Sequence, residues 1–185
     1  MRLFALAGAA AVLYALAGCS NTGPDLKSTA KGAMAALTPS DHPAAAPDTV
    51  FKDADGKAHT LAEFRGKVTL VNLWANWCAP CKAEIPSLAK LATEYAGKPV
   101  AIVPISVGKD ADETAGHAFI DRNPPLVFYT EPTYAIAFAL SPPAEGMPTT
   151  VLYDRHGVER ARLAGGADWS GPDARAVIDA LLAEK

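Results

Sequence analysis

A strand that runs directly into a pair of cysteines is the feature that most restricts how this chain can fold. Val68 to Trp74 is a predominantly apolar run with β-branched residues, which is typical of a central strand covered on both faces. Two residues later comes the segment Trp77-Cys78-Ala79-Pro80-Cys81. From Pro80 to Tyr95 apolar residues recur at helical spacing, and proline fits the first turn of a helix. The sequence therefore predicts a strand whose end delivers two cysteines to the start of a helix.

The rest of the pattern predicts one α/β domain from about residue 48 to residue 185. Asp55-Gly56 is a hairpin turn signal between two short strands, and Val100 to Val107 has the composition of a second buried strand. Two strands joined through a helix in one sheet require parallel pairing and a right-handed crossover. An antiparallel half should follow, with strands at 149–153 and 158–163, helices near 110–123 and 132–140, and a final helix capped within Ser170 to Asp173.

Residues 1–19 have the layout of an export signal. Arg2 precedes an apolar run from Leu3 to Leu16, which is shorter than the roughly 20 residues that a membrane span needs. The segment Leu16-Ala17-Gly18-Cys19 resembles a bacterial lipobox, which implies cleavage before Cys19 and acylation of its thiol. An ordinary signal peptide and a short uncleaved anchor are the alternatives. We expect the protein on the periplasmic face of the cytoplasmic membrane, held by the lipid or by the signal.

Residues 20–47 have the composition of a flexible tether. They are rich in Ala, Pro, Ser, Thr and Gly and contain no aromatic residue, so they cannot bury enough apolar surface to fold alone. Within this segment, Leu26, Ala30, Ala33, Met34 and Leu37 recur at helical spacing. A short helix lying on the domain is therefore a second possibility for part of the segment.

The cysteines themselves point to redox chemistry. Zinc binding needs a second cysteine pair or histidines at ligand spacing, and the four histidines of this chain are scattered. At the start of a helix, free N–H groups and the positive end of the dipole favour a thiolate, which is the reactive form of cysteine. We expect Cys78 to be exposed and nucleophilic, and Cys81 to be more buried. If Cys19 carries lipid, these two remain to pair with each other.

The segment Val71-Asn-Leu-Trp-Ala-Asn-Trp-Cys-Ala-Pro-Cys-Lys-Ala-Glu-Ile-Pro86 resembles the active-site segment of TlpA/ResA-type proteins, most closely the TlpA type. These are membrane-anchored, thioredoxin-like disulfide reductases of bacterial envelopes. Gly146-Met-Pro-Thr-Thr150 resembles their second active-site element, and Ala164 to Ser170 resembles a TlpA segment before the last helix. The resemblance implies a thioredoxin-like fold, with a central mixed β-sheet flanked by helices and an N-terminal hairpin extension. It implies no cofactor and no bound metal.

The resemblance also assigns roles to individual residues. It implies that Pro148 follows a cis peptide bond and faces the cysteines. It implies that Glu84 handles protons near both sulfurs, because Asn72 stands where thioredoxin has a buried Asp. Trp77, with the intervening Ala79 and Pro80, is expected to form the rim that substrate contacts. Met147 should meet an incoming peptide, whereas Trp74 and Trp169 are expected to pack in the core.

For function, the resemblance implies reduction of client disulfides in an oxidising compartment. Electrons would come from a membrane thiol transporter of the DsbD/CcdA kind. The expected clients are copper-assembly proteins or subunits of cytochrome oxidase, or apocytochrome c. We favour oxidase copper-site assembly, because Gly146-Met-Pro-Thr-Thr150 lacks the Gly-x-Pro-Glu signature of dedicated cytochrome c maturation.

Two other functions share the fold or the ligand type. A thiol peroxidase needs Thr or Ser three residues before its reactive cysteine, and here that residue is Ala75. A copper chaperone would use Cys78 and Cys81 as soft ligands, but its usual cysteine spacing is longer and includes a downstream histidine. With a net charge of −3 and no dense Lys/Arg patch, the chain gives no sign of nucleic-acid binding.

Overall fold

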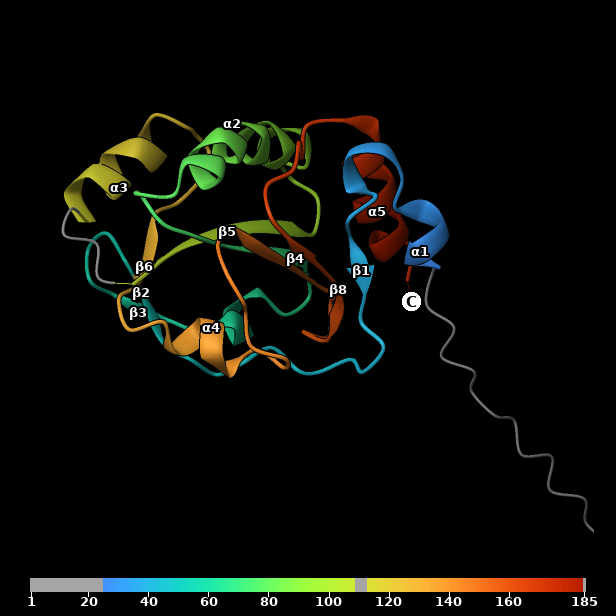
Figure 1. Cartoon of the computed structure of the whole chain (residues 1–185), viewed down its shortest axis with the longest axis horizontal. Coiled ribbons are helices and arrows are strands. Elements are labelled where there is room, and N and C mark those ends of the chain that lie inside the picture. The colour runs from blue at the N-terminus through green and yellow to red at the C-terminus, as the bar shows by residue number, and fades with distance from the viewer. Residues whose placement is uncertain (1–24, 109–112, 185) are drawn as a thin grey trace, which may run out of the picture.

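Strand β4 (Val68–Trp74) is fully buried and lies in the middle of a mixed sheet. The computed structural model describes residues 25–108 and 113–184. In it, β4 pairs in parallel with β5 (Val100–Val107) and antiparallel with β7 (Thr149–Tyr153). Helix α2 (Ala79–Glu94) makes the connection from β4 to β5 (Figure 1). This is the strand–helix–strand unit that the sequence predicts.

The described sheet has the strand order β1-β8-β7-β4-β5-β6-β2-β3. The expected antiparallel half is confirmed, because β8 (Glu159–Ala164) pairs antiparallel with β7. The expected hairpin is also present, as β2 (Phe51–Asp53) and β3 (Ala58–His59), and it forms one edge of the sheet. Two strands were not expected: β1 (Thr38–Pro39) at the other edge, and β6 (Tyr129–Glu131), which connects β5 to the hairpin.

Helices cover both faces of the sheet, and the sheet separates two hydrophobic cores. Figure 1 shows α2 and α3 (Glu113–Asp121) on one face, α4 (Ala135–Ala139) on the other, and α5 (Pro172–Leu182) beside α1 (Leu26–Thr29). Alternating residues of β4 serve the two cores: Leu70 and Trp74 pack with α2 and α5, whereas Leu73 packs with α4. None of the helices in the described residues is both long and apolar enough to span a bilayer.

The start of the final helix differs from the one that the sequence predicts. The residue at the N-cap of α5 is Gly171, so the expected side-chain cap is absent, and the Ser170 hydroxyl donates to Asp168 instead. The expected start of the helix near residue 110 lies outside the described residues, and α3 is described from Glu113.

The N-terminal segment differs from the flexible tether that its composition predicts. Helix α1 (Leu26–Thr29) and a 3₁₀ turn (Gly32–Met34) pack against α5, and Leu26, Met34 and Leu37 are buried. The segment then follows the outer edge of β8 through β1 and an isolated bridge at residue 45. A few well-placed apolar side chains and this edge pairing hold an otherwise polar segment in place. Residues 1–24, including the lipobox and Cys19, lie outside the described residues.

We predict that Met34→Ala destabilises the domain, because the Met34 side chain is 0% exposed in the core beside α5. Removing a buried methionine side chain costs about 2–5 kcal/mol in free energy of unfolding. Urea unfolding of the oxidised protein measures this. Lys31→Ala, an exposed change in the same segment, is the control and should change stability by less than about 0.5 kcal/mol. Equal stability of Met34→Ala and wild type would show that the segment does not belong to the folded core.

Candidate active site

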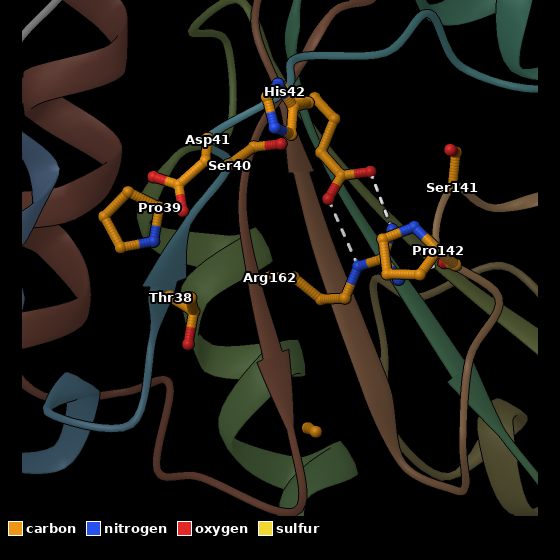
Figure 2. Close-up of a pocket in the computed structure, with 10 residues that line it drawn as sticks. Thr38, Pro39, Ser40, Asp41, His42, Ser141, Pro142 and Arg162 are labelled. Atoms are coloured by element: carbon orange, nitrogen blue, oxygen red, sulfur yellow. Dashed lines mark hydrogen bonds and ion pairs between the residues drawn. The ribbon is translucent and has the colours of Figure 1, made fainter.

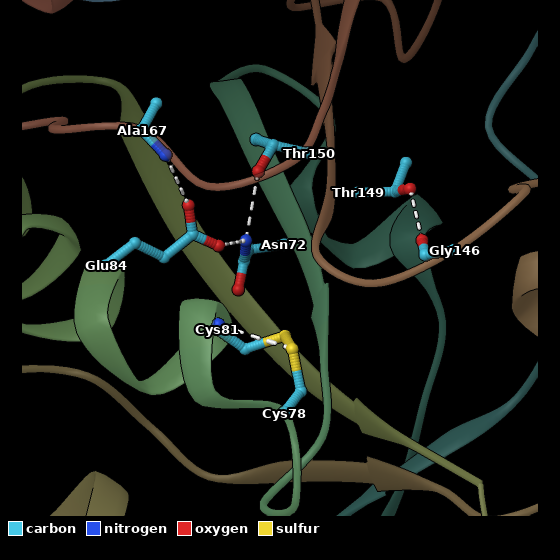
Figure 3. The surroundings of a disulfide bond; sticks show 8 residues. All are labelled: Asn72, Cys78, Cys81, Glu84, Gly146, Thr149, Thr150 and Ala167. Carbon is cyan, nitrogen blue, oxygen red and sulfur yellow. Dashed lines mark hydrogen bonds between the residues drawn. A yellow bond between two sulfur atoms is a disulfide. The ribbon is translucent and has the colours of Figure 1, made fainter.

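The two cysteines of the motif form a disulfide at the N-terminus of α2 (Figure 3). Cys78 is the N-cap residue, and its sulfur accepts a hydrogen bond from the backbone N–H of Cys81 at 3.3 Å. Pro80 occupies the first turn, where a backbone N–H would have no partner within the helix, so the missing N–H of proline costs no hydrogen bond. After reduction, the same N–H group and the helix dipole are placed to stabilise a thiolate on Cys78. The strand-to-helix junction therefore builds the redox site that the spacing predicts.

The exposure expected for Cys78 is wrong in this oxidised form. Cys78 is only 5% exposed, against 0% for Cys81, because the disulfide and the bond from the Cys81 N–H hold its side chain on the helix start. Cys78 is still more exposed than Cys81, as expected, although the two exposed fractions differ little. The exposed surface comes from the neighbours: Trp77 is 64% exposed, and Ala79 and Pro80 are exposed as well.

Glu84 is buried beneath this surface, one helical turn after Cys81. The side chain of Asn72 donates to Glu84 Oε1 at 2.7 Å, and the backbone N–H of Ala167 donates to Oε2 at 3.1 Å (Figure 3). Burial raises the pKa of Glu84, and these two hydrogen bonds oppose that rise without cancelling it. Glu84 is 3% exposed, so it is not a solvated carboxylate on the helix surface. A carboxyl group with a raised pKa therefore lies close to the redox pair.

The loop before β7 supplies the second expected element. The Met147–Pro148 peptide bond is cis, as the family resemblance implies, and the loop has a further cis bond at Ser141–Pro142. Pro148 is buried, and its carbonyl accepts the Gly165 N–H at 2.8 Å. Met147 is half-buried and packs against both cores. The loop is thus fixed at its base and presents Met147 near the sheet end that carries α2.

The segment that resembles a TlpA loop, residues 164–170, is bonded to α2. Besides the Ala167 contact with Glu84, the backbone N–H of Trp169 donates to the Ser87 hydroxyl at 3.0 Å. A groove of about 530 Å³ runs between this loop and the helix, and Pro80, Glu84 and Asp168 are among its lining residues. Glu84 therefore borders a groove that lies next to the cysteine motif. Trp74 and Trp169 are fully buried in the core, as expected.

Arg162 is a residue of this region that the sequence did not single out. Its guanidinium group donates to both carboxylate oxygens of Glu159, at 3.1 and 2.9 Å, and to the Pro142 carbonyl at 2.5 Å (Figure 2). These contacts line a pocket of about 320 Å³ between β1, β8 and the loop before Met147. An alternating strand pattern predicts which side chains leave the sheet but not this bond to a distant carbonyl. Arg162 therefore ties the cis-proline loop to β8.

Comparison with known proteins gives consistent matches. The family model described as Redoxin matches residues 42–179. The thiol-disulfide oxidoreductase ResA of Geobacillus thermodenitrificans is 31% identical over 126 residues, which are 65% of this chain and 67% of the relative. ResA of Bacillus subtilis is 34% identical over 115 residues, or 60% and 61%. The chain thus spans about three fifths to two thirds of these relatives.

Solved structures agree with the fold. A putative thiol-disulfide oxidoreductase from Bacteroides vulgatus aligns with a TM-score of 0.62 at 26% identity, covering 74% of this chain and 94% of that one. A putative thiol:disulfide interchange protein DsbE from Chlorobium tepidum aligns with a TM-score of 0.65 at 24% identity, covering 76% and 98%. The second likeness supports the thioredoxin-like fold alone.

We predict that Glu84 makes stability fall with rising pH. Its pKa is raised in the folded protein, so folding favours the protonated form. That contribution is complete below the ordinary glutamate value of 4.5 and is lost as the pH rises through the raised value. Urea unfolding of wild type and Glu84→Gln from about pH 4 to pH 8 should show wild type losing stability relative to the variant. A difference that stays constant with pH would contradict the raised pKa.

Proposed function

The chain belongs to the redoxin family and carries a thiol–disulfide oxidoreductase site, and from this premise we propose that it reduces disulfide bonds of client proteins outside the cytoplasm. The observation that carries the proposal is the Cys78–Cys81 disulfide at the start of α2, followed one helical turn later by a buried carboxyl group. The named ResA relatives support the reaction type.

In the proposed reaction, the thiolate of reduced Cys78 attacks a sulfur of the client disulfide. A mixed disulfide forms, and the client's other sulfur leaves as a thiolate that takes up a proton. Cys81 then gives up its proton and attacks the Cys78 sulfur, which restores the Cys78–Cys81 bond, and the second client sulfur leaves as a thiolate that takes up a proton. Each turnover moves two electrons to the client, so a dithiol donor must reduce the protein again. A membrane thiol transporter of the DsbD/CcdA kind is the proposed donor.

Glu84 is the proposed proton-handling residue of this exchange. Its carboxyl group has a raised pKa, is bonded through Asn72 to the strand below the cysteines, and borders a groove open to solvent. Such a group holds a proton at higher pH than an exposed glutamate does and can give it up as the sulfurs change charge. In this proposal Glu84 has the role of the buried Asp of thioredoxin, whose position is occupied by Asn72.

The proposed client surface surrounds Cys78. Trp77 provides an exposed apolar face, with Ala79 and Pro80 beside it. The backbone on the N-terminal side of Pro148, at Met147, would pair with a client segment in extended form, as in strand addition. In this proposal Pro148 faces the cysteines, as the family resemblance implies. The bond from Arg162 to Pro142 keeps this loop attached to the sheet.

We further propose that the protein is tethered to the periplasmic face of the cytoplasmic membrane. The support is the lipobox-like segment that ends in Cys19, with an uncleaved signal as the other form of anchor. The proposed clients belong to respiratory assembly. We favour a copper chaperone or subunit of cytochrome oxidase over apocytochrome c, on the sequence of the Gly146 to Thr150 loop.

We predict that Cys81→Ser traps the client. Without the second thiol, Cys78 cannot be released from the mixed disulfide, so a covalent adduct should accumulate in cells and be identifiable by mass spectrometry after non-reducing purification. Cys78→Ser is the matched control and should capture nothing, because Cys81 is fully buried. Equal capture by both variants, or none by Cys81→Ser, would contradict the reductase assignment.

A further inference from the structure

Asn72 has a buried oxygen atom that no group in the described protein satisfies. The residue is 0% exposed and lies in β4, beneath the first turns of α2. Its Nδ2 donates to Glu84 Oε1 at 2.7 Å and to Thr150 Oγ1 at 2.9 Å, which uses both amide hydrogens. Its Oδ1 has no hydrogen-bond partner. Buried acceptors without a partner are rare and costly, so this one calls for an explanation.

The direction of this oxygen is set by the two hydrogen bonds of the amide nitrogen. Nδ2 faces both of its acceptors, Glu84 Oε1 and Thr150 Oγ1, so the amide oxygen is turned away from both. Figure 3 shows Oδ1 on the side of Cys81 and the disulfide. The strand pattern agrees, because the neighbouring inward residues Leu70 and Trp74 belong to the same core as Cys81. The unpaired acceptor therefore points toward the redox pair.

We propose that Asn72 Oδ1 accepts a hydrogen bond from the Cys81 thiol once the disulfide is reduced. This inference rests on the proposed function and identifies a further residue for the same site. A disulfide sulfur has no proton to donate, so the acceptor is unpaired only in the oxidised protein. Asn72 therefore favours the reduced form, because the cost of burying Oδ1 is offset by a hydrogen bond only in the dithiol.

The reduction step supplies the required proton. A thiolate of the donor dithiol attacks Cys78 and forms a mixed disulfide, and Cys81 leaves as a thiolate. Cys81 takes one of the two protons that the donor dithiol gives up and becomes the S–H donor for Oδ1. The donor's second thiolate then attacks the donor sulfur that is bonded to Cys78. This forms the donor's disulfide and releases Cys78 as a thiolate. The other proton goes to solvent. Asn72 thus keeps the proton on Cys81 and leaves Cys78 as the nucleophile.

The first test is the redox equilibrium of Asn72→Leu against glutathione. Without Oδ1, the equilibrium constant should move about tenfold toward the disulfide, which corresponds to ~30 mV for a two-electron couple. Thr150→Val is the matched control: it removes the other partner of the same amide but keeps Oδ1, so its equilibrium constant should stay near that of wild type. An unchanged constant in Asn72→Leu, or an equal shift in Thr150→Val, would overturn the proposal.

The second test needs no change at Asn72 and decides the matter if Asn72→Leu does not fold. The ¹³C NMR signal of the Asn72 side-chain carbonyl should move downfield when wild type is reduced with dithiothreitol. In reduced Cys81→Ala, which has no thiol to donate, the signal should stay near its oxidised position. Coincident signals in the two reduced proteins would overturn the hydrogen bond. Because dithiothreitol stands in for the dithiol donor and no client is present, failure of wild type to reduce a protein disulfide would reject only the proposed function.

Discussion

The placement of two sulfur atoms at the positive end of helix α2 is the constraint on which the rest of this structure depends. That placement exists because β4 is fully buried between β5 and β7, and because the chain leaves β4 directly into α2. The same end of the helix supplies the N–H group that meets the Cys78 sulfur. A slip of β4 against its neighbours would move both cysteines away from the cis-proline loop, so sheet register and chemistry are set together.

A small polar network in the core links segments that are far apart in the sequence. Glu84 of α2, Asn72 of β4, Thr150 of β7 and the backbone of Ala167 are joined by three hydrogen bonds. Burial makes these bonds costly to break and raises the pKa of the carboxyl group at their centre. The network therefore holds the helix, the sheet and the 164–170 loop in one arrangement.

Much of the site could be predicted from the sequence, because its signals are local. A buried strand, a cysteine pair and a helix follow one another without interruption, and the cis bond before Pro148 came from the family resemblance. What could not be predicted depends on contacts across the fold. Met34 is buried only because α5 lies beside it, the short strand β6 exists only because β5 and the hairpin flank it, and Arg162 meets a carbonyl 20 residues away. The exposure of Cys78 was misjudged because it depends on the disulfide.

The most direct measurement of the central claim is the pH dependence of alkylation of Cys78 in the reduced protein, with Cys81 replaced by alanine so that one thiol of the pair reacts. The account predicts that the iodoacetamide rate reaches half its maximum within about pH 3.5–7.5, the range of cysteines stabilised at helix N-termini. A half-maximum near pH ~8.5, the value of a free cysteine, would contradict it.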